Sequence, residues 1–134
     1  IEQNYFKAAE WYSLASNLGR HAQSQFALAQ LYFNGRGVPH DYAEALALYR
    51  KAARRGHAAA QYLIGAMYQD GWGVKSDYAE AYKWYSLALP RAAEVMAVNS
   101  SYDPARALER LKKKMRKFQI GQGEKRLKEW RRSR

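Results

Sequence analysis

Residues 35–45 read GRGVPHDYAEA, and residues 71–81 read GWGVKSDYAEA. The two stretches begin 36 residues apart, and residues 26–53 laid over residues 62–89 are identical at 11 of 28 positions. A self-similarity with a period of about 20 to 50 residues indicates a repeat architecture, because a single unit cannot bury its apolar face alone. A truncated copy precedes these two and lies over residues 41–56 at a spacing of 37, so the chain begins with half a repeat.

Each full unit reads as two helices joined by a glycine-containing corner. Before the corner, apolar residues recur at three- and four-residue spacing, which is typical of a helix, and we call this segment helix A. The corner glycines end helix A because glycine accepts a positive φ. Asp41 and Asp77 then stand at an N-cap position with Glu44 and Glu80 three residues later, a capping box that opens helix B.

The repeats and the segment that follows them predict one domain. We expect an all-α fold, an α-solenoid of helix-turn-helix repeats that forms a right-handed superhelix with a two-helix C-terminal cap. Residues 1–134 then divide into a half repeat at 4–21, full repeats at 22–57 and 58–90, and basic capping helices at 91–134. Because the chain starts within a repeat and with isoleucine, we expect further sequence upstream.

The repeated pattern resembles the Sel-one-like repeat family, which are α-solenoids related to the tetratricopeptide repeats. In the first full copy the residues that carry the resemblance are Leu28-Ala29, Tyr32, Gly35 to Val38, Asp41, Ala45, Tyr49, Ala52-Ala53 and Gly56-His57-Ala58. The resemblance covers residues 4–90 and implies a scaffold or adaptor that binds a protein or peptide partner. It also implies a bacterial protein, either of the envelope (periplasmic) or of the cytoplasm.

Several kinds of chemistry lack the residues they need. The chain has no cysteine, which excludes disulfides, thiolate catalysis and cysteine-based zinc sites. The histidines His21, His40 and His57 do not have the spacing of metal ligands, and the glycine-rich corners lack the preceding strand of a dinucleotide site. No apolar stretch approaches the roughly 18 residues of a membrane span. We therefore expect a non-enzymatic protein without a metal or cofactor.

The partner surface is predicted by analogy with related helical repeats, in which helix A lines the concave face. The predicted partner-binding residues are Phe26, Gln30, Phe33 and Asn34 in the first full repeat and Tyr62, Gln69 and Asp70 in the second. Phe26, Phe33 and Tyr62 would form an apolar patch there, and exposed patches of this kind mark contact sites. The alternative is that a neighbouring helix covers the three rings.

The positive charge of the chain is concentrated at its end. Residues 103–134 carry 13 Lys and Arg against 4 Asp and Glu, which is +9 of the total of +11. A basic patch of Arg106, Arg110, Lys113 and Lys117 is predicted to form one row on a single helix, because these residues recur at i, i+4, i+7 and i+11. Such a row can attract an acidic partner, a nucleic acid or another anionic surface. A solvated face of the cap is the competing explanation, and nucleic acid is the less favoured partner.

Overall fold

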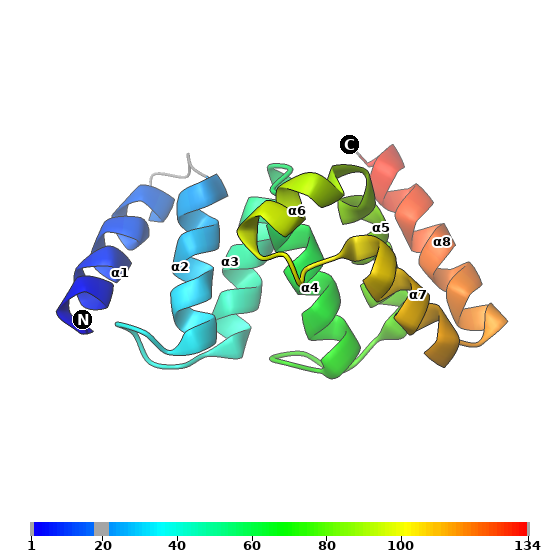
Figure 1. The fold of residues 1–134 in the computed structure, drawn as a ribbon, viewed down its shortest axis with the longest axis horizontal. Coiled ribbons are helices and arrows are strands. Elements are labelled where there is room, and N and C mark those ends of the chain that lie inside the picture. The colour runs from blue at the N-terminus through cyan, green and yellow to red at the C-terminus, as the bar shows by residue number, and fades with distance from the viewer. Residues whose placement is uncertain (1, 18–21, 134) are drawn as a thin grey trace.

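The computed structural model describes residues 2–17 and 22–133, and the described residues form helices and no strands. The repeat region contains α1 (Glu2–Asn17), α2 (Ala22–Asn34), α3 (Tyr42–Arg54), α4 (Ala58–Asp70) and α5 (Tyr78–Ala88). After it come the 3-10 helix η1 (Leu89–Arg91), α6 (Ala92–Val98), α7 (Pro104–Lys114) and α8 (Lys117–Arg132). Figure 1 shows α1 to α5 following one another along the longest axis, so the fold is the expected α-solenoid.

Within the solenoid each helix packs against its neighbours in the chain. Helix α2 packs on α3 and α4 on α5 within the two full repeats, while the contacts of α1 with α2 and of α3 with α4 join successive units. Alanines at the crossings, including Ala29, Ala45 and Ala52, have no exposed surface, and small side chains let helices approach closely. Tyr49 and Tyr85 fill the space between the helices and are buried.

The corner glycines and capping aspartates act where the sequence placed them, but the glutamate half of each capping box does not form, because the N–H groups of the two aspartates donate to backbone carbonyls of helix A. The Asp41 carboxylate accepts the Glu44 N–H at 3.0 Å, and the Asp77 carboxylate accepts the Glu80 N–H at 3.1 Å. Gly35 and Gly37 have φ of 66° and 74°, a left-handed conformation that favours glycine. Both helix B segments therefore begin at the predicted residue.

The segment after the repeats holds one more helix than the sequence indicated. The two predicted cap helices are α7 and α8, and both pack against α5. Before them, η1 and α6 turn the chain back over α4. Pro90 lies in the first turn of η1, where its missing N–H breaks no hydrogen bond of the helix. Helix α6 therefore belongs neither to a repeat nor to the predicted pair.

The prediction of one cationic row on one helix is wrong. Helix α7 ends at Lys114, and Lys117 is the first residue of α8. Between them, Met115 and Arg116 have extended backbones with ψ of 146° and 156°. Met115 is only 9% exposed, and its burial accompanies the break that separates Lys117 from Arg106, Arg110 and Lys113.

Candidate protein-binding surface

One face of α2 is accessible along its whole length. Gln23, Ala27, Gln30 and Asn34 recur at i, i+4, i+7 and i+11, a spacing that places them on one side of a helix. Gln23 and Asn34 are exposed, and Ala27 and Gln30 are half-buried. We call these four residues the α2 strip. It contains two of the residues predicted from the sequence, Gln30 and Asn34.

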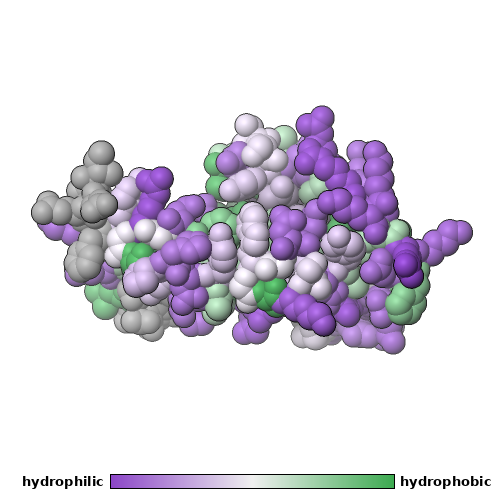
Figure 2. All heavy atoms as spheres, turned by 90° about the horizontal axis from the view of Figure 1, so that it is seen from below, coloured by the Kyte–Doolittle hydropathy of each residue, from purple (hydrophilic) through white to green (hydrophobic). Residues whose placement is uncertain are grey.

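The first half of the same register on α4 is closed, while its second half is as accessible as in α2. One repeat later, Ala59 and Leu63 take the places of Gln23 and Ala27, and they are 2% and 6% exposed. Helix α4 packs against α6 as well as α3 and α5, whereas α2 packs mainly against α1 and α3. Figure 1 shows α6 and α7 in front of α4 and α5, and Figure 2, seen from below, shows the molecule raised over that part. The chain thus covers the start of helix A of its own second repeat.

Tyr62 is one of the residues under this cover. Its ring stacks on that of Tyr102, with centroids 5.0 Å apart and planes 24° apart, and it also contacts Tyr85 at 5.3 Å. Burial raises the pKa of the Tyr62 phenol, and Tyr102 raises it further. The predicted patch therefore does not extend to Tyr62 as a freely accessible ring.

The prediction that Phe26 is a partner-binding residue is wrong. Its side chain is only 4% exposed, because the ring of His57 stacks on it at 4.4 Å and that of Tyr49 lies at 5.7 Å. The sequence analogy placed Phe26 on the concave face, but residues of the following helices cover it. Phe26 is part of the core and is not available to a partner.

His57 links the starts of the two helix A segments. Its Nδ1 accepts the Ala60 N–H at 3.2 Å and so caps α4. Because that nitrogen accepts, Nε2 carries the hydrogen and donates it to the Gln23 Oε1 at 2.9 Å. Burial lowers the pKa of His57, and the Arg91 guanidinium lowers it further against the opposing Glu94. The geometry therefore requires a neutral imidazole.

A hollow lies at this end of the α2 strip. It has a volume of about 260 Å³ and is lined by Gln23, His57, Ala58, Ala59, Arg91, Glu94 and Val98. Arg91 pairs with Glu94 and donates to the Gly56 carbonyl, which ties η1 and α6 to the corner before α4. The hollow is therefore a cleft between the α2 strip and α6.

At the other end of α2, three aromatic rings meet. The Phe33 centroid lies 5.1 Å from Tyr42 and 5.4 Å from Trp72, and Trp72 stacks on Tyr42 at 5.8 Å with planes 14° apart. Trp72 is 38% exposed, and Phe33 is half-buried. A Cβ on Gly73 would lie 2.7 Å from the Tyr42 carbonyl carbon, so glycine permits this close approach of the second corner to α3.

Sequence reasoning missed Trp72 and Tyr42 as surface residues. The signal was the variable residue between the two corner glycines, which is Arg36 in one repeat and Trp72 in the next. In the first repeat Arg36 donates to the Tyr5 hydroxyl at 2.8 Å and lies over its ring. The same corner position thus contacts a tyrosine near the start of the second helix of the preceding unit, α1 in one case and α3 in the other, by a cation in the first and by an indole in the second.

The remaining predicted residues are placed as follows. The Gln30 Oε1 accepts the Tyr49 hydroxyl, and the Gln69 Oε1 accepts the Tyr85 hydroxyl at 2.9 Å. Each glutamine therefore satisfies a buried tyrosine of its own repeat. Asp70 is exposed at the end of α4. The structure brings Gln30, Phe33 and Asn34 together on α2 and leaves Asp70 on the next repeat.

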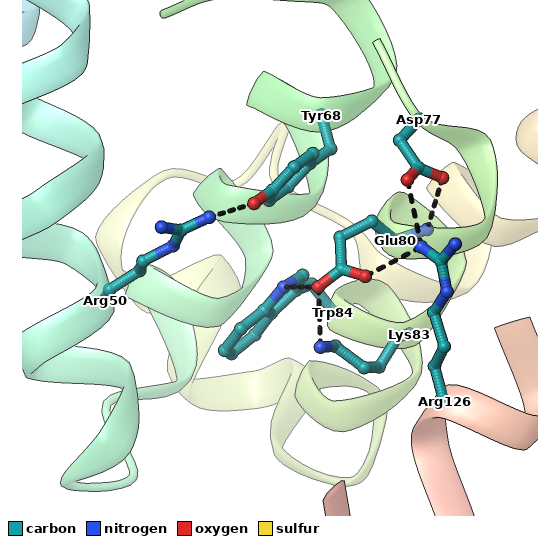
Figure 3. A network of polar contacts seen from close by, with 7 residues as sticks. All are labelled: Arg50, Tyr68, Asp77, Glu80, Lys83, Trp84 and Arg126. Carbon is teal, nitrogen blue, oxygen red and sulfur yellow. Dashed lines mark hydrogen bonds and ion pairs between the residues drawn. The ribbon is translucent and has the colours of Figure 1, made fainter. Parts of the chain in front are cut away.

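A polar network attaches α8 to the solenoid (Figure 3). Arg126 donates to Asp77 and to Glu80, both at 2.9 Å, and Glu80 also pairs with Lys83 at 2.6 Å and accepts the Trp84 indole N–H. Burial opposes ionisation of Asp77, but the Arg126 guanidinium and two backbone N–H groups outweigh it and lower its pKa. This network therefore joins α8 to the start of α5.

Trp130 reinforces the same attachment. Its ring packs edge-on against Trp84 at 4.9 Å, and the Lys83 ammonium lies over both rings. Trp130 is half-buried there, against α5 of the last repeat. Helix α8 is thus held by aromatic and ionic contacts together.

Neither a metal site nor a membrane span is found in residues 2–17 and 22–133. In that part of the chain no three His, Asp or Glu side chains lie close enough to hold a metal ion, and no helix is long and apolar enough to cross a bilayer. His21 lies outside the described residues. The predicted basic residues Arg106, Arg110, Lys113 and Lys117 are all exposed.

The sequence and the structure both match known repeat proteins. The Sel1 repeat model matches residues 1–19, 22–57 and 58–89, which is more than half of the chain. The chain belongs to the Sel1 repeat family. Proteins of Sel1 repeats are generally protein-interaction scaffolds of non-enzymatic fold. The Sel1 match ends at residue 89, so α6, α7 and α8 follow the last matched repeat.

Two solved Sel1-type structures are similar to this one. The crystal structure of c5321, a protective antigen present in uropathogenic Escherichia coli strains displaying an SLR fold, has a TM-score of 0.85 and 29% identity over 97% of this chain. A Sel1 repeat protein from Oxalobacter formigenes has a TM-score of 0.59 and 37% identity over 62% of this chain. The matched parts are 26% and 33% of those proteins, so this chain spans a quarter to a third of their lengths. No curated protein is similar enough in sequence to count as a match.

Proposed function

We propose that this chain is a non-enzymatic scaffold that binds a protein or peptide on helix A of its first full repeat. The main support for this proposal is a difference in the exposure of helix A between the two full repeats. At the start of helix A the α2 strip is accessible, whereas the corresponding residues of α4, Ala59 and Leu63, are closed and α4 packs against the chain's own α6. Helix α6 therefore covers the start of the second helix A as a bound segment would.

The chemistry of the α2 strip supports an extended or helical peptide ligand. The amides of Gln23 and Asn34 offer donors and acceptors to a main chain, and Ala27 between them permits close approach. Trp72 and Phe33 lie beside the end of the strip, and tryptophan is enriched among the residues that dominate binding energy. The surface thus combines a narrow polar track with an aromatic anchor.

The test uses peptides selected from a displayed random library against the wild-type chain. Ala27→Arg fills the middle of the strip, so we expect the affinity of selected peptides to fall by about tenfold or more, equal to about 1.4 kcal/mol. The matched control is Ala47→Arg, which adds the same side chain at an exposed position of α3. Fluorescence anisotropy with each labelled peptide measures both.

An equal loss of affinity in both arginine variants, or no loss in Ala27→Arg, would refute the assignment to the α2 strip. Circular dichroism of both variants separates a binding defect from unfolding. A Trp72→Ala variant provides an independent arm, because the ring is partly exposed and belongs to the corner after α4 and not to α2. We expect weaker binding there as well.

A further inference from the structure

The turn between α7 and α8 gathers cations around one exposed ring. Residues 112–118 read KKKMRKF, and the helices end and begin at Lys114 and Lys117. Phe118 is 71% exposed, which makes it the most exposed large apolar side chain of the described residues. Nothing in the repeat packing accounts for a phenylalanine in this position.

We call Lys113, Lys114, Arg116, Lys117 and Phe118 the basic tip. All five side chains are exposed. Within the described part of the chain, none of the four cations forms an ion pair, in contrast to Arg126, which pairs with two carboxylates. The turn lies at the outer end of the molecule, at the lower right of Figure 1 and opposite α1. A flat surface can therefore reach it without meeting the repeats.

The turn itself is held firmly enough to present these residues. Met115 is buried, and the Gln119 Oε1 accepts the Arg116 N–H at 2.9 Å. The Ile120 N–H bonds the Arg116 carbonyl at 3.1 Å, and Ile120 packs against the core. The side chains of Met115 and Ile120 thus pack inward, and Phe118 and its neighbouring cations remain outside.

We propose that the basic tip docks this chain on an anionic phospholipid bilayer. Clusters of four or more Lys and Arg bind anionic lipid surfaces by Coulomb attraction. An aromatic ring among them enters the region between headgroups and acyl chains, as on the apolar side of interfacial helices. Here the four cations lie at the phosphates and Phe118 passes below them. The solenoid, with its α2 strip at the far end, then projects from the membrane.

A bilayer fits the basic tip better than a nucleic acid does. Single strands bind in basic grooves where successive bases stack on several aromatic side chains. The tip is a convex turn with one projecting ring, and the other aromatics near the basic segment are engaged, since Trp130 packs on Trp84 and Lys112 lies over the Tyr82 ring. A single exposed phenylalanine with four neighbouring cations on a convex turn fits a planar anionic surface.

The experiment measures flotation of the chain with phosphatidylcholine vesicles containing about 30% phosphatidylglycerol, and with pure phosphatidylcholine vesicles. The tip variant combines Lys113→Gln, Lys114→Gln, Arg116→Gln and Lys117→Gln. The matched control combines Lys125→Gln, Lys128→Gln, Arg131→Gln and Arg132→Gln, which removes the same charge from exposed positions elsewhere on α8. We expect the tip variant to lose about a hundredfold in partitioning and the control about threefold or less, since near-surface cations contribute most.

Phe118→Ser tests the ring separately from the charge. We expect about a tenfold loss of partitioning with an unchanged thermal melt, because Phe118 makes little packing contact in the folded chain. No binding to the anionic vesicles, equal losses in the two charge variants, or an unaffected Phe118→Ser would each overturn the proposal. Tighter binding to a single-stranded oligothymidylate than to the vesicles would overturn it in favour of a nucleic acid.

Discussion

At the scale of single residues, His57 joins the starts of α2 and α4 through its two ring nitrogens and its ring face. It caps α4, donates to Gln23 of α2 and stacks on Phe26. Each of these contacts depends on a neutral ring held between two helices. The sequence analysis named His57 as part of the family pattern and excluded it as a metal ligand, and its structural role follows from the contacts.

The protonation of His57 should therefore destabilise the fold. The unfolded chain takes up a proton near the ordinary pKa of 6.5, whereas the folded chain, whose His57 pKa is lowered, does so only at lower pH. The unfolded state thus binds more protons in this window, so stability is full above it and is lost as the pH falls. We expect the urea midpoint to decrease between about pH 7.5 and pH 5.5.

The comparison for this pH dependence is His57→Asn, because asparagine also caps a helix but does not titrate. Its absolute stability is expected to be lower, since the stacking on Phe26 is lost, so the slopes with pH are compared. The other histidines are unchanged between the two proteins. Parallel slopes in wild type and variant would contradict the role assigned to His57.

At the scale of secondary-structure elements, the packing of α8 on α5 decides how the C-terminal end is built. The two glycines of α8 are two residues apart and lie in different surroundings. A Cβ on Gly123 would lie 2.6 Å from the Tyr82 ring, whereas a Cβ on Gly121 would meet nothing within 4 Å. At Gly123 the backbone of α8 thus lies close against α5, and Gly121 faces open space.

Alanine at these two positions should have opposite effects. Gly121→Ala gains helix propensity without a clash, so we expect about 0.5 to 1 kcal/mol of stabilisation. Gly123→Ala pushes α8 away from Tyr82, so we expect about 1 to 3 kcal/mol of destabilisation. Urea denaturation of both variants measures the difference. Stabilisation by Gly123→Ala would mean that α8 does not pack on α5 as described.

At the scale of the whole molecule, the two full repeats of the solenoid are covered differently. In a repeat array each unit contacts mainly its neighbours, so a perturbation stays local. The first full repeat keeps an accessible helix A, while the second is covered by α6 and by Tyr102, which follows it. The turn before Tyr102 is closed by its N–H to the Asn99 carbonyl at 2.9 Å.

Removal of the Tyr102 ring should loosen the cover without loosening the solenoid. For Tyr102→Ala we expect faster deuterium uptake in residues 89–103 and in α4, with unchanged uptake in α2 and α3, since hydrogen exchange reports local opening. Ser100→Ala, in the same exposed turn, is the control. An equal rise of uptake in α2 and α3 would show that the cover supports the whole array.

Much of this architecture was predictable from local signals in the sequence. The corner glycines, the capping aspartates and the 36-residue period act within a few residues or by repetition, so they placed the paired helices and the family resemblance correctly. Helix α6 has no copy in the repeats and follows Pro90, so neither the 36-residue period nor a capping residue predicted it. The prediction of one cationic row was wrong because the helix breaks at the buried Met115, and the spacing of charged residues contains no signal for such a break.

The sequence by itself determined the paired helices of the repeats, their boundaries at the capped corners and the concentration of charge at the end. Only the tertiary structure decided which surfaces remain free. Phe26 and Phe33 stand on the same helix, yet His57 and Tyr49 cover the first while the second borders a partly exposed Trp72. Exposure depends on which side chains from distant segments pack on a residue. Helical periodicity specifies the direction of a side chain along its own helix, and the neighbour that covers it is selected by packing.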